Sequence, residues 1–303
     1  MKSKAIRPCA AVGLLLPTDF AKVNSYTARC ETSEIPFVRF GFACGGGAAL
    51  SVAACVADAI RSDGSNAVNV KAIAAANPKT VVVVKSGSAV LMPWIDSVPA
   101  VLEAWYPGEE DGHAVADVLT GKVNPRGKLP LSFPRSAEDT LASNPEQYPG
   151  VNGVAHYSEG LEVGYRGYTA HKITPLFPFG FGLSYTEFSF DGLKVSKQPG
   201  SDSATVSFKV TNTGKRAGAE VAEVYLGFPA IEEGSEPPVQ LKGFSKVILN
   251  PGESKTVEVK LDARAFSYWS EKAHAWTVAP GEFQVMVGDS SANTPLKANL
   301  TVR

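Results

Sequence analysis

Three consecutive acidic residues, Glu109, Glu110 and Asp111, are the first candidates for chemistry in this sequence. Paired carboxyl groups can hydrolyse a glycosidic bond, but a retaining enzyme holds them about 5–5.5 Å apart across the sugar. Adjacent side chains point in divergent directions, and neighbouring negative charges favour contact with solvent. The segment that follows, GHAVADVLTG, has the pattern of a helix that closes on Gly121, and a helix N-terminus favours negative charge. We therefore expect the three acids to begin a helix.

Neither a metal site nor a cofactor site is predicted. His113 and Asp117 are four residues apart, but two ligands without a third do not form a metal site. Gly45–Gly47 could cradle an anion, yet no apolar strand precedes the three glycines. The four cysteines are Cys9, Cys30, Cys44 and Cys55. They lack C-x-x-C spacing, which leaves buried thiols or a disulfide as the alternatives.

Composition excludes two classes of partner. The 303 residues carry a formal net charge of -1 and no basic patch, so we expect no binding to nucleic acid. No apolar run approaches the roughly 20 residues of a membrane span, which predicts a soluble protein that contacts no membrane. The start of the chain resembles a weak signal peptide, with Lys2 and Lys4 before a short apolar stretch, but no A-x-A cleavage site follows. The localisation, and with it the use of the glycosylation sequon at Asn299, stays open.

The first part of the chain has the pattern of an α/β domain. Ala48–Arg61 is rich in small residues and is predicted as a helix, and Ala67–Asn77 is predicted as a second one. Thr80–Lys85 reads TVVVVK, a continuous β-branched run typical of a strand that is buried on both faces. Lys128–Phe133 is predicted as one more strand. Helices that alternate with buried strands indicate a mostly parallel sheet.

The second part has a different pattern. Asn144–Gly182 is too long and too aromatic for a flexible linker, so we expect it to wrap across a surface and bury its rings. After Tyr185, apolar and polar residues alternate between turn signals, which predicts an antiparallel β-sandwich of about seven strands. We place the domain boundary near residue 186, giving domains 1–185, in which 1–45 have no clear pattern, and 186–303.

Several segments occur in the order found in a known family: KAIAAANPKTVVVV, LMPW, AWYPGEEDGHAVADVLTGKVNPRGKLPLSFP, YSEGLEVGYRGY and PLFPFGFGLSYTEF. Residues 67–303 resemble the C-terminal half of glycoside hydrolase family 3 enzymes, and they are most similar to the β-glucosidases. The last part, with VTNTGKRAGAEVAEVYLGFP and QLKGFSKVILNPGES, resembles the fibronectin type III-like domain that ends many members.

The resemblance implies a barrel domain that carries an aspartate nucleophile, followed by an α/β sandwich that supplies a glutamate as acid/base. We expect the barrel to be absent from this chain. The region that matches the acid/base loop reads ADAIRSDGSNA, and the sequence holds no glutamate between Glu34 and Glu103. Asp63 is a poor substitute. No catalytic residue is therefore predicted here, and the isolated chain is expected to be inactive.

Aromatic side chains could stack on a sugar ring, or they could be core and interface residues: Trp94, Trp105, Tyr106, Tyr148 and Tyr157. With one acid to bind hydroxyl groups, the candidate substrate-binding residues are Trp105, Tyr106, Glu110 and Tyr157. Glu159 and Arg166 match the family segment YSEGLEVGYRGY, and we expect them to form an ion pair or a hydrogen-bond hub.

Two functions are compatible with these observations. The first is a β-glucosidase fragment, whose family reaction is the retaining hydrolysis of terminal, non-reducing β-D-glucosyl residues. It would bind a β-glucoside or oligosaccharide when completed by a barrel domain. The second is a non-catalytic module that binds carbohydrate or protein. An apolar face left uncovered by the barrel would favour self-association. The sugar specificity and the oligomeric state stay open.

Overall fold

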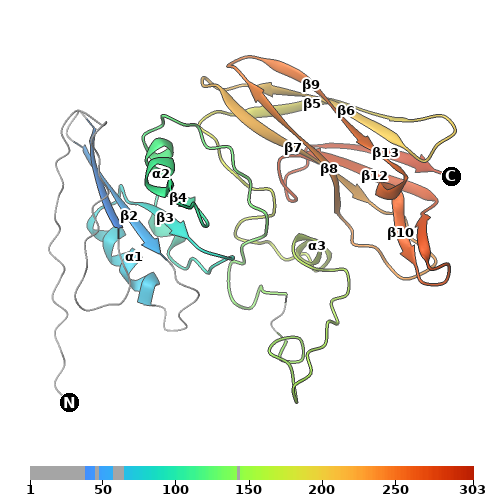
Figure 1. Cartoon of the computed structure of the whole chain (residues 1–303), viewed down its shortest axis with the longest axis horizontal. Coiled ribbons are helices and arrows are strands. Elements are labelled where there is room, and N and C mark those ends of the chain that lie inside the picture. Colours follow the sequence, from blue (N-terminus) through green and yellow to red (C-terminus); the bar gives the residue numbers. More distant parts are fainter. Residues whose placement is uncertain (1–37, 45–47, 57–64, 142–143) are drawn as a thin grey trace. The chain divides into compact units, whose positions relative to one another are not determined.

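A computed structural model describes residues 38–44, 48–56, 65–141 and 144–303 of the chain (Figure 1), with the backbone alone up to Asn69. The chain forms two compact units, of which the first ends at Ala116 and the second begins at Asp117. Within the described ranges, no helix is long and apolar enough to cross a membrane.

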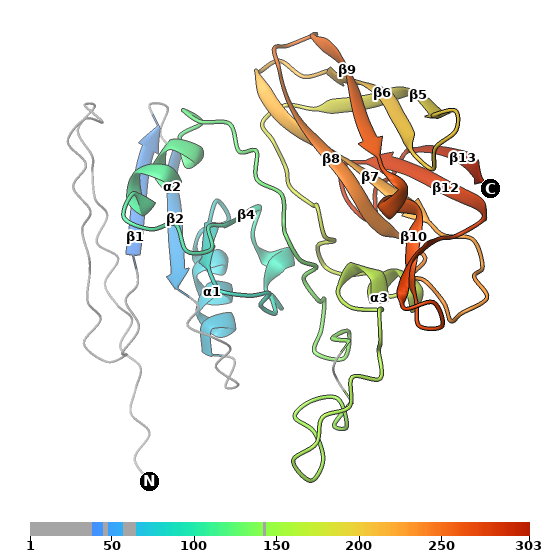
Figure 2. The same ribbon diagram turned by 45° about the vertical axis from the view of Figure 1, so that its right-hand side comes forward.

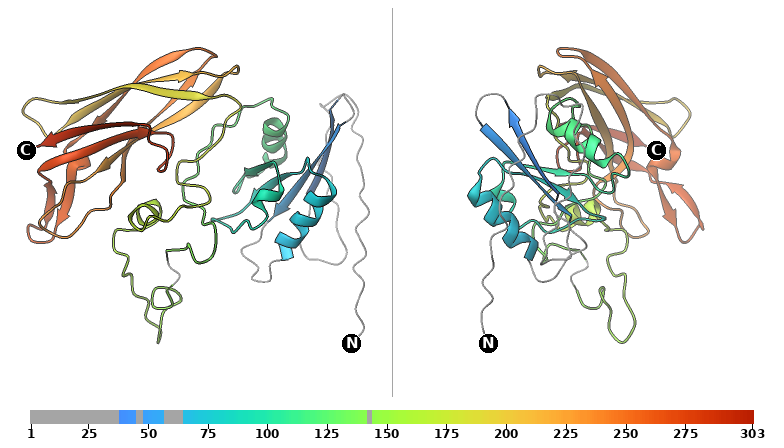
Figure 3. Two further views of the ribbon diagram at one scale, coloured as in Figure 1. Left: turned by 180° about the vertical axis from the view of Figure 1, so that it is seen from behind. Right: turned by 60° about the vertical axis from the view of Figure 1, so that its left-hand side comes forward.

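A four-stranded sheet forms the centre of the first unit, in the order β1-β2-β3-β4 (Figure 3). Its strands are β1 (Val38–Cys44), β2 (Ala48–Val56), β3 (Val81–Lys85) and β4 (Ala100–Glu103). β1 pairs antiparallel with β2, whereas β2, β3 and β4 run parallel. Val82, Val83 and Val84 are fully buried in β3, as expected for a strand covered on both faces. The predicted α/β class with a mostly parallel sheet is confirmed.

Helices precede and follow the parallel strands. α1 (Ser65–Ala76) leads into β3 and lies beside the sheet in each view of Figure 3. It confirms the helix predicted at Ala67–Asn77, and it ends before Pro78, whose ring disfavours a helical residue ahead of it. A 3₁₀ turn, η2 (Ile95–Ser97), lies between β3 and β4, and α2 (Asp111–Leu119) follows β4.

The helix predicted at Ala48–Arg61 is wrong, because Ala48–Val56 forms strand β2. The same residues also alternate with period two, through Leu50 and Val52, and small side chains fit both periods. Pairing decides between them: β2 lies between β1 and β3 and shares hydrogen bonds with both. Alanine's intrinsic preference for a helix is weak, and such tertiary contacts override it.

The strand predicted at Lys128–Phe133 is also wrong. Only Phe133 forms a β-bridge there, with Phe177, and Leu129 exchanges backbone hydrogen bonds with Gly180 and Phe181. Between these two points lies Pro130, which has no N–H to donate to a ladder. The segment therefore runs alongside residues 177–181 without becoming a regular strand.

The second unit contains a β-sandwich (Figure 2). One sheet has the order β13-β12-β7-β8 and the other β5-β6-β9, and every pairing in both sheets is antiparallel. These strands are β5 (Phe188–Lys197), β6 (Ala204–Asn212), β7 (Gly218–Gly227), β8 (Gln240–Leu249), β9 (Ser254–Leu261), β12 (Gly281–Gly288) and β13 (Leu296–Val302). The seven predicted strands are confirmed, and a hairpin of β10 (Ser267–Ser270) and β11 (Ala275–Val278) adds a small third sheet.

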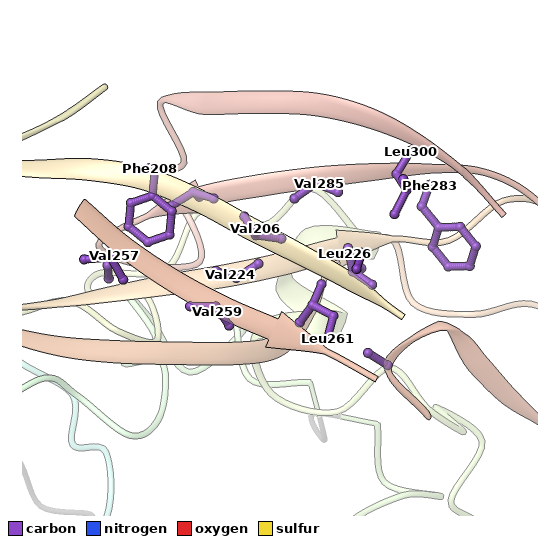
Figure 4. Packing of buried hydrophobic residues seen from close by; sticks show 14 of the residues in the cluster. Val206, Phe208, Val224, Leu226, Val257, Val259, Leu261, Phe283, Val285 and Leu300 are labelled. Carbon is purple, nitrogen blue, oxygen red and sulfur yellow. The ribbon is translucent and has the colours of Figure 1, made fainter. Parts of the chain in front are cut away.

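The core of the sandwich lies between its two sheets (Figure 4). Phe208 from β6, Leu226 from β7 and Phe283 from β12 are fully buried there. In β6 and β9 the buried residues occur at every second position, because side chains on a strand alternate between the two faces. The period-two pattern of the sequence and the packing therefore agree.

The aromatic segment Asn144–Gly182 divides into two parts. Its second part contains α3 (Tyr165–Ala170) and packs on the sandwich. The Tyr165 ring contacts Phe179 and Tyr225, with centroids 4.8 and 5.9 Å away, and its hydroxyl accepts a hydrogen bond from the Leu241 N–H. In the first part Tyr148 is 72% exposed and Tyr157 85% exposed, so the prediction of buried rings is wrong there.

Candidate functional site

Polar side chains gather where the parallel strands of the first unit end. Lys85 ends β3, Ser86 follows it, and Glu103 ends β4. Val84 pairs with Glu103 in the register of these strands, so the three residues lie at one edge of the sheet. The carboxyl edge of a parallel sheet is the usual place for a ligand. We call Lys85, Ser86, Glu103, Trp105 and Asp111 the strand-end cluster.

Glu103 is held by hydrogen bonds inside the cluster. Its carboxylate accepts from the backbone N–H of Trp105 at 2.8 Å and lies 3.3 Å from the Ser86 hydroxyl. Burial raises the pKa of Glu103, and the two hydrogen bonds oppose that rise. This carboxyl group is thus positioned by its neighbours and partly shielded from water.

The three adjacent acids begin helix α2, as predicted. The Glu110 carbonyl accepts the first helical hydrogen bond, from the N–H of Ala114 at 2.9 Å, and Asp111 is the first helical residue. The expectation that all three face solvent is wrong for Asp111. Its carboxylate forms an ion pair with Lys85, and its Oδ1 is buried without a hydrogen-bond partner among the described residues.

The segment between β4 and α2 presents two of the predicted sugar-binding rings. Trp105 has a φ of 50°, an unusual value for a bulky residue, and its N–H is fixed by Glu103. Tyr106 is 82% exposed, and its hydroxyl lies where a side chain at position 87 would be, above Gly87. The structure thus brings Trp105 and Tyr106 to the same strand edge as Glu103.

Glu110, the third candidate on this segment, pairs with His113. Its carboxylate lies 2.7 Å from the imidazole Nδ1, and both side chains are largely exposed. Asp117, four residues after His113, pairs instead with Lys122 at 3.0 Å. Across the described residues, no group of three potential ligands gathers for a metal ion.

The other candidates are spread through the chain. Trp94 is buried in the first unit and belongs to the core. Tyr157 and Tyr148 lie in the exposed part of the second unit, where Glu159 accepts a hydrogen bond from Gln147 at 3.2 Å. Arg166 lines a cleft of the second unit.

Several predictions lie outside the described residues. They concern the signal-like start, Gly45–Gly47, Asp63, Cys9 and Cys30, together with the side chains of Cys44 and Cys55.

Sequence reasoning missed Lys85, Ser86 and Glu103 as site residues. A signal was present, because Lys85 and Ser86 directly follow a buried β-branched run and Glu103 follows the apolar run AVL. Polar residues at the carboxyl ends of parallel strands converge once those strands pair. What the sequence did not provide was the pairing of β3 with β4.

Comparison with known proteins agrees with this architecture. Residues 57–185 match the glycosyl hydrolase family 3 C-terminal domain, and residues 220–291 match the fibronectin type III-like domain. Thermostable β-glucosidase B of Acetivibrio thermocellus is 46% identical over 237 residues, which cover 77% of this chain and 31% of that protein. An exo-α-(1→6)-L-arabinopyranosidase of Bifidobacterium breve is 44% identical over 220 residues, covering 72% of this chain and 28% of that protein.

Solved structures give the same result. A β-glucosidase from Streptomyces venezuelae, determined in complex with D-glucose, has a TM-score of 0.76 and 40% identity, and the match covers 79% of this chain and 31% of that one. The chain thus spans about a third of the length of these relatives. These matches and the two domains show that the chain belongs to glycoside hydrolase family 3. It corresponds to the C-terminal region of the family's members.

Proposed function

We propose that the chain is the C-terminal region of a retaining β-glucosidase, and that the segment from Trp105 to Glu110 forms part of the wall of its glucoside site. The observation that carries this proposal is the exposed ring of Tyr106, which stands beside the polar edge of a parallel sheet. An aromatic face suits the C–H surface of a pyranose, and the nearby Glu110 carboxylate suits its hydroxyl groups. Tyr157, an exposed residue of the second unit, stays a separate prediction as a sugar-binding residue.

Hydrolysis needs one ionised and one protonated carboxyl group facing each other across the sugar. The two partly buried acids of the strand-end cluster are already engaged, Glu103 by Ser86 and Trp105, and Asp111 by Lys85. We therefore propose that neither acts as nucleophile or acid/base, and that the 303-residue polypeptide does not hydrolyse glucosides by itself. A barrel domain would supply the nucleophile.

An assay with p-nitrophenyl β-D-glucopyranoside tests both proposals. The purified chain, Glu110→Gln and Asp63→Asn should all release no nitrophenol above background. Release that is lost in one variant would show that this chain has a catalytic carboxyl group of its own. Adding the separately expressed barrel domain of the Acetivibrio thermocellus relative supplies the nucleophile but no acid/base. Azide, added as an external nucleophile in place of the base-activated water, should then give turnover, because nitrophenolate leaves without protonation. Tyr106→Ala should then raise KM several-fold, whereas Phe244→Ala, an exposed aromatic of β8, should leave KM unchanged.

The alternative function, a module that binds carbohydrate without hydrolysing it, is favoured by one separate observation. The second unit contains a cleft of about 1090 Å³ with two exposed tryptophans.

A further inference from the structure

The cleft lies on the second unit, at one end of the β-sandwich. Most of its lining comes from the loop between β7 and β8 with the start of β8, the 3₁₀ turn η3 (Ala263–Phe266), and the hairpin of β10 and β11, and Leu161 and Arg166 complete it. Its volume of about 1090 Å³ slightly exceeds the 300–1,000 Å³ that are typical of small-molecule pockets, and it is open to solvent. A cleft of this volume can hold an oligosaccharide. Every residue that lines it belongs to the second unit, so the cleft does not depend on the strand-end cluster.

Two tryptophans form an aromatic platform in this cleft. Trp269 and Trp276 are direct cross-strand partners in the hairpin, and their ring centroids are 5.5 Å apart at 64°. Each tryptophan is 48% exposed, although burial of an aromatic side chain is strongly favourable in water. The guanidinium of Arg264 lies 3.1 Å from the Trp276 ring centroid and so fixes that ring by a cation–π contact. The platform is therefore held in place while much of its surface stays available.

Hydrogen bonds fix polar groups around the two tryptophans. The Glu233 carboxylate accepts hydrogen bonds from the Ser270 hydroxyl at 2.9 Å and from the N–H of Lys272 at 3.2 Å, and so ties the β7–β8 loop to the hairpin. Gln240 donates to Glu236 at 2.7 Å in the same loop region. Burial lowers the pKa of Lys242, which lines the cleft as well. These side chains are preorganised hydrogen-bonding groups, which reduces the entropy lost when a ligand binds.

The charges of the cleft balance. Four acids and four bases line it: Glu233, Glu236, Asp262, Glu271, Arg166, Lys242, Arg264 and Lys272. A polyanion such as a nucleic acid or a uronic-acid polymer would meet as many repulsive as attractive groups. A neutral ligand rich in hydroxyl groups can instead accept from the bases and donate to the acids. Combined with the exposed indole faces, this favours a sugar chain over a charged polymer.

We propose that this cleft binds a neutral glucan oligosaccharide, stacked on Trp269 and Trp276 and hydrogen-bonded by the acids and bases around them. The inference goes beyond the glucoside site proposed for the strand-end cluster, since it concerns binding without hydrolysis at a second place. Such a site would hold the protein on a polysaccharide while chemistry proceeds elsewhere.

Isothermal titration of the full chain with cellotetraose and with maltotetraose tests the proposal, and tetragalacturonate serves as the charged comparison. At least one neutral tetrasaccharide should bind more tightly than tetragalacturonate. Trp269→Ala should weaken that binding at least tenfold, and Trp269→Tyr, which keeps an aromatic face, should restore most of it. Phe244→Ala, which removes an exposed ring outside the cleft, should have no effect.

Three results would overturn the proposal: no binding of either neutral tetrasaccharide at millimolar concentration, tighter binding of tetragalacturonate, or unchanged binding in both Trp269→Ala and Trp276→Ala. Glu236→Ala, on the loop side, checks that a loss does not come from a disordered hairpin, because it should also weaken binding. Failure here would leave the nitrophenyl glucoside assay unaffected, so this proposal and the hydrolase proposal fail separately.

Discussion

Each of the two units contains a poorly exposed lysine that pairs with an acidic side chain, Lys85 in the first and Lys128 in the second, but the number of acids near the lysine differs. In the first unit Lys85 pairs with Asp111. In the second, Lys128 pairs with Glu220 at 2.8 Å and is also the cation that acts on Glu223. One positive charge does not compensate two buried carboxylates. The pKa of Glu223 is raised to about 7, chiefly by burial and also by the charges of Asp289 and Glu220, while the Tyr225 hydrogen bond and Lys128 oppose the rise. The deep burial of Glu223 beside a second acid thus makes the second unit respond to pH near neutrality.

Removing Lys128 should give the largest effect. Lys128→Met leaves the buried Glu220 without its partner, and breaking such a pair costs about 3–5 kcal/mol of unfolding free energy. Calorimetry of the whole chain should show a much lower Tm for the transition of the second unit. Lys122→Met is the matched control, because its ion pair with Asp117 lies at the surface and contributes about 0–1 kcal/mol. Equal effects from the two variants would mean that burial does not distinguish these pairs.

The second expected effect is a dependence of stability on pH. The pKa of Glu223 is about 7 in the folded state against 4.5 for an ordinary glutamate, so between these values the folded state binds more protons than the unfolded state. The unfolding free energy of the second unit should therefore fall as pH rises from about 4.5 to 7, by about 3 kcal/mol in total. Glu220, whose pKa is also raised by burial, acts in the same direction.

Urea titrations at pH 5, 6 and 7 measure this dependence. Glu223→Gln keeps the shape and the hydrogen bond to the Tyr225 hydroxyl but carries no titrating group, so it should remove most of the slope. Glu258→Gln, an exposed position on β9, should keep the slope of the unmodified chain. A stability that rises between pH 5 and 7 would contradict the assignment of the raised pKa to Glu223.

The third prediction compares the contributions of two of the three adjacent acids, Asp111 and Glu110, to the stability of the first unit. Asp111→Asn removes the partner of Lys85 and the negative charge in the first turn of α2, which should cost about 1–2 kcal/mol. Glu110→Gln should cost less than about 0.5 kcal/mol, because its side chain is 78% exposed. Denaturant unfolding of both variants gives the comparison. If Glu110→Gln costs as much as Asp111→Asn, the ion pair with Lys85 is not what stabilises this turn.

How far the sequence predicts such features depends on how local they are. The start of α2 at Asp111, the end of α1 before Pro78 and the strand Val81–Lys85 follow from neighbouring residues, and they are confirmed. The period-two strands of the sandwich follow from alternation over a few residues. The strand Ala48–Val56 does not, because its small residues fit both a helix and a strand until β1 and β3 pair with it.

The candidate site shows the same limit. Trp105, Tyr106 and Glu110 could be selected from their types on one short segment, and the structure places all three between or beside β4 and α2. Lys85 and Asp111 are 26 residues apart, and only the parallel pairing of β3 and β4 brings them together. The cleft of the second unit combines a loop, a 3₁₀ turn and a hairpin, which no local pattern in the sequence connects.

The smallest expected effect concerns the contact that holds the Tyr106 ring in the first unit. A Cβ on Gly87 would overlap the Tyr106 hydroxyl, which is the far end of an exposed side chain and can move. Gly87→Ala should therefore cost less than about 1 kcal/mol of unfolding free energy. The same substitution in a Tyr106→Ala background should cost nothing, since the overlapping group is gone. A double-mutant cycle measures this difference as a coupling energy.

That cycle also tests the proposed glucoside wall. If the Tyr106 ring lies over Gly87, Gly87→Ala should displace the ring. In the assay that includes the barrel domain, KM should then rise, as it should for Tyr106→Ala. A coupling energy near zero, together with an unchanged KM, would mean that the ring is not held over Gly87 in solution. The first unit would then present a mobile aromatic side chain at Tyr106 where the second presents the fixed pair Trp269 and Trp276, and the cleft would be the better supported stacking surface of the two.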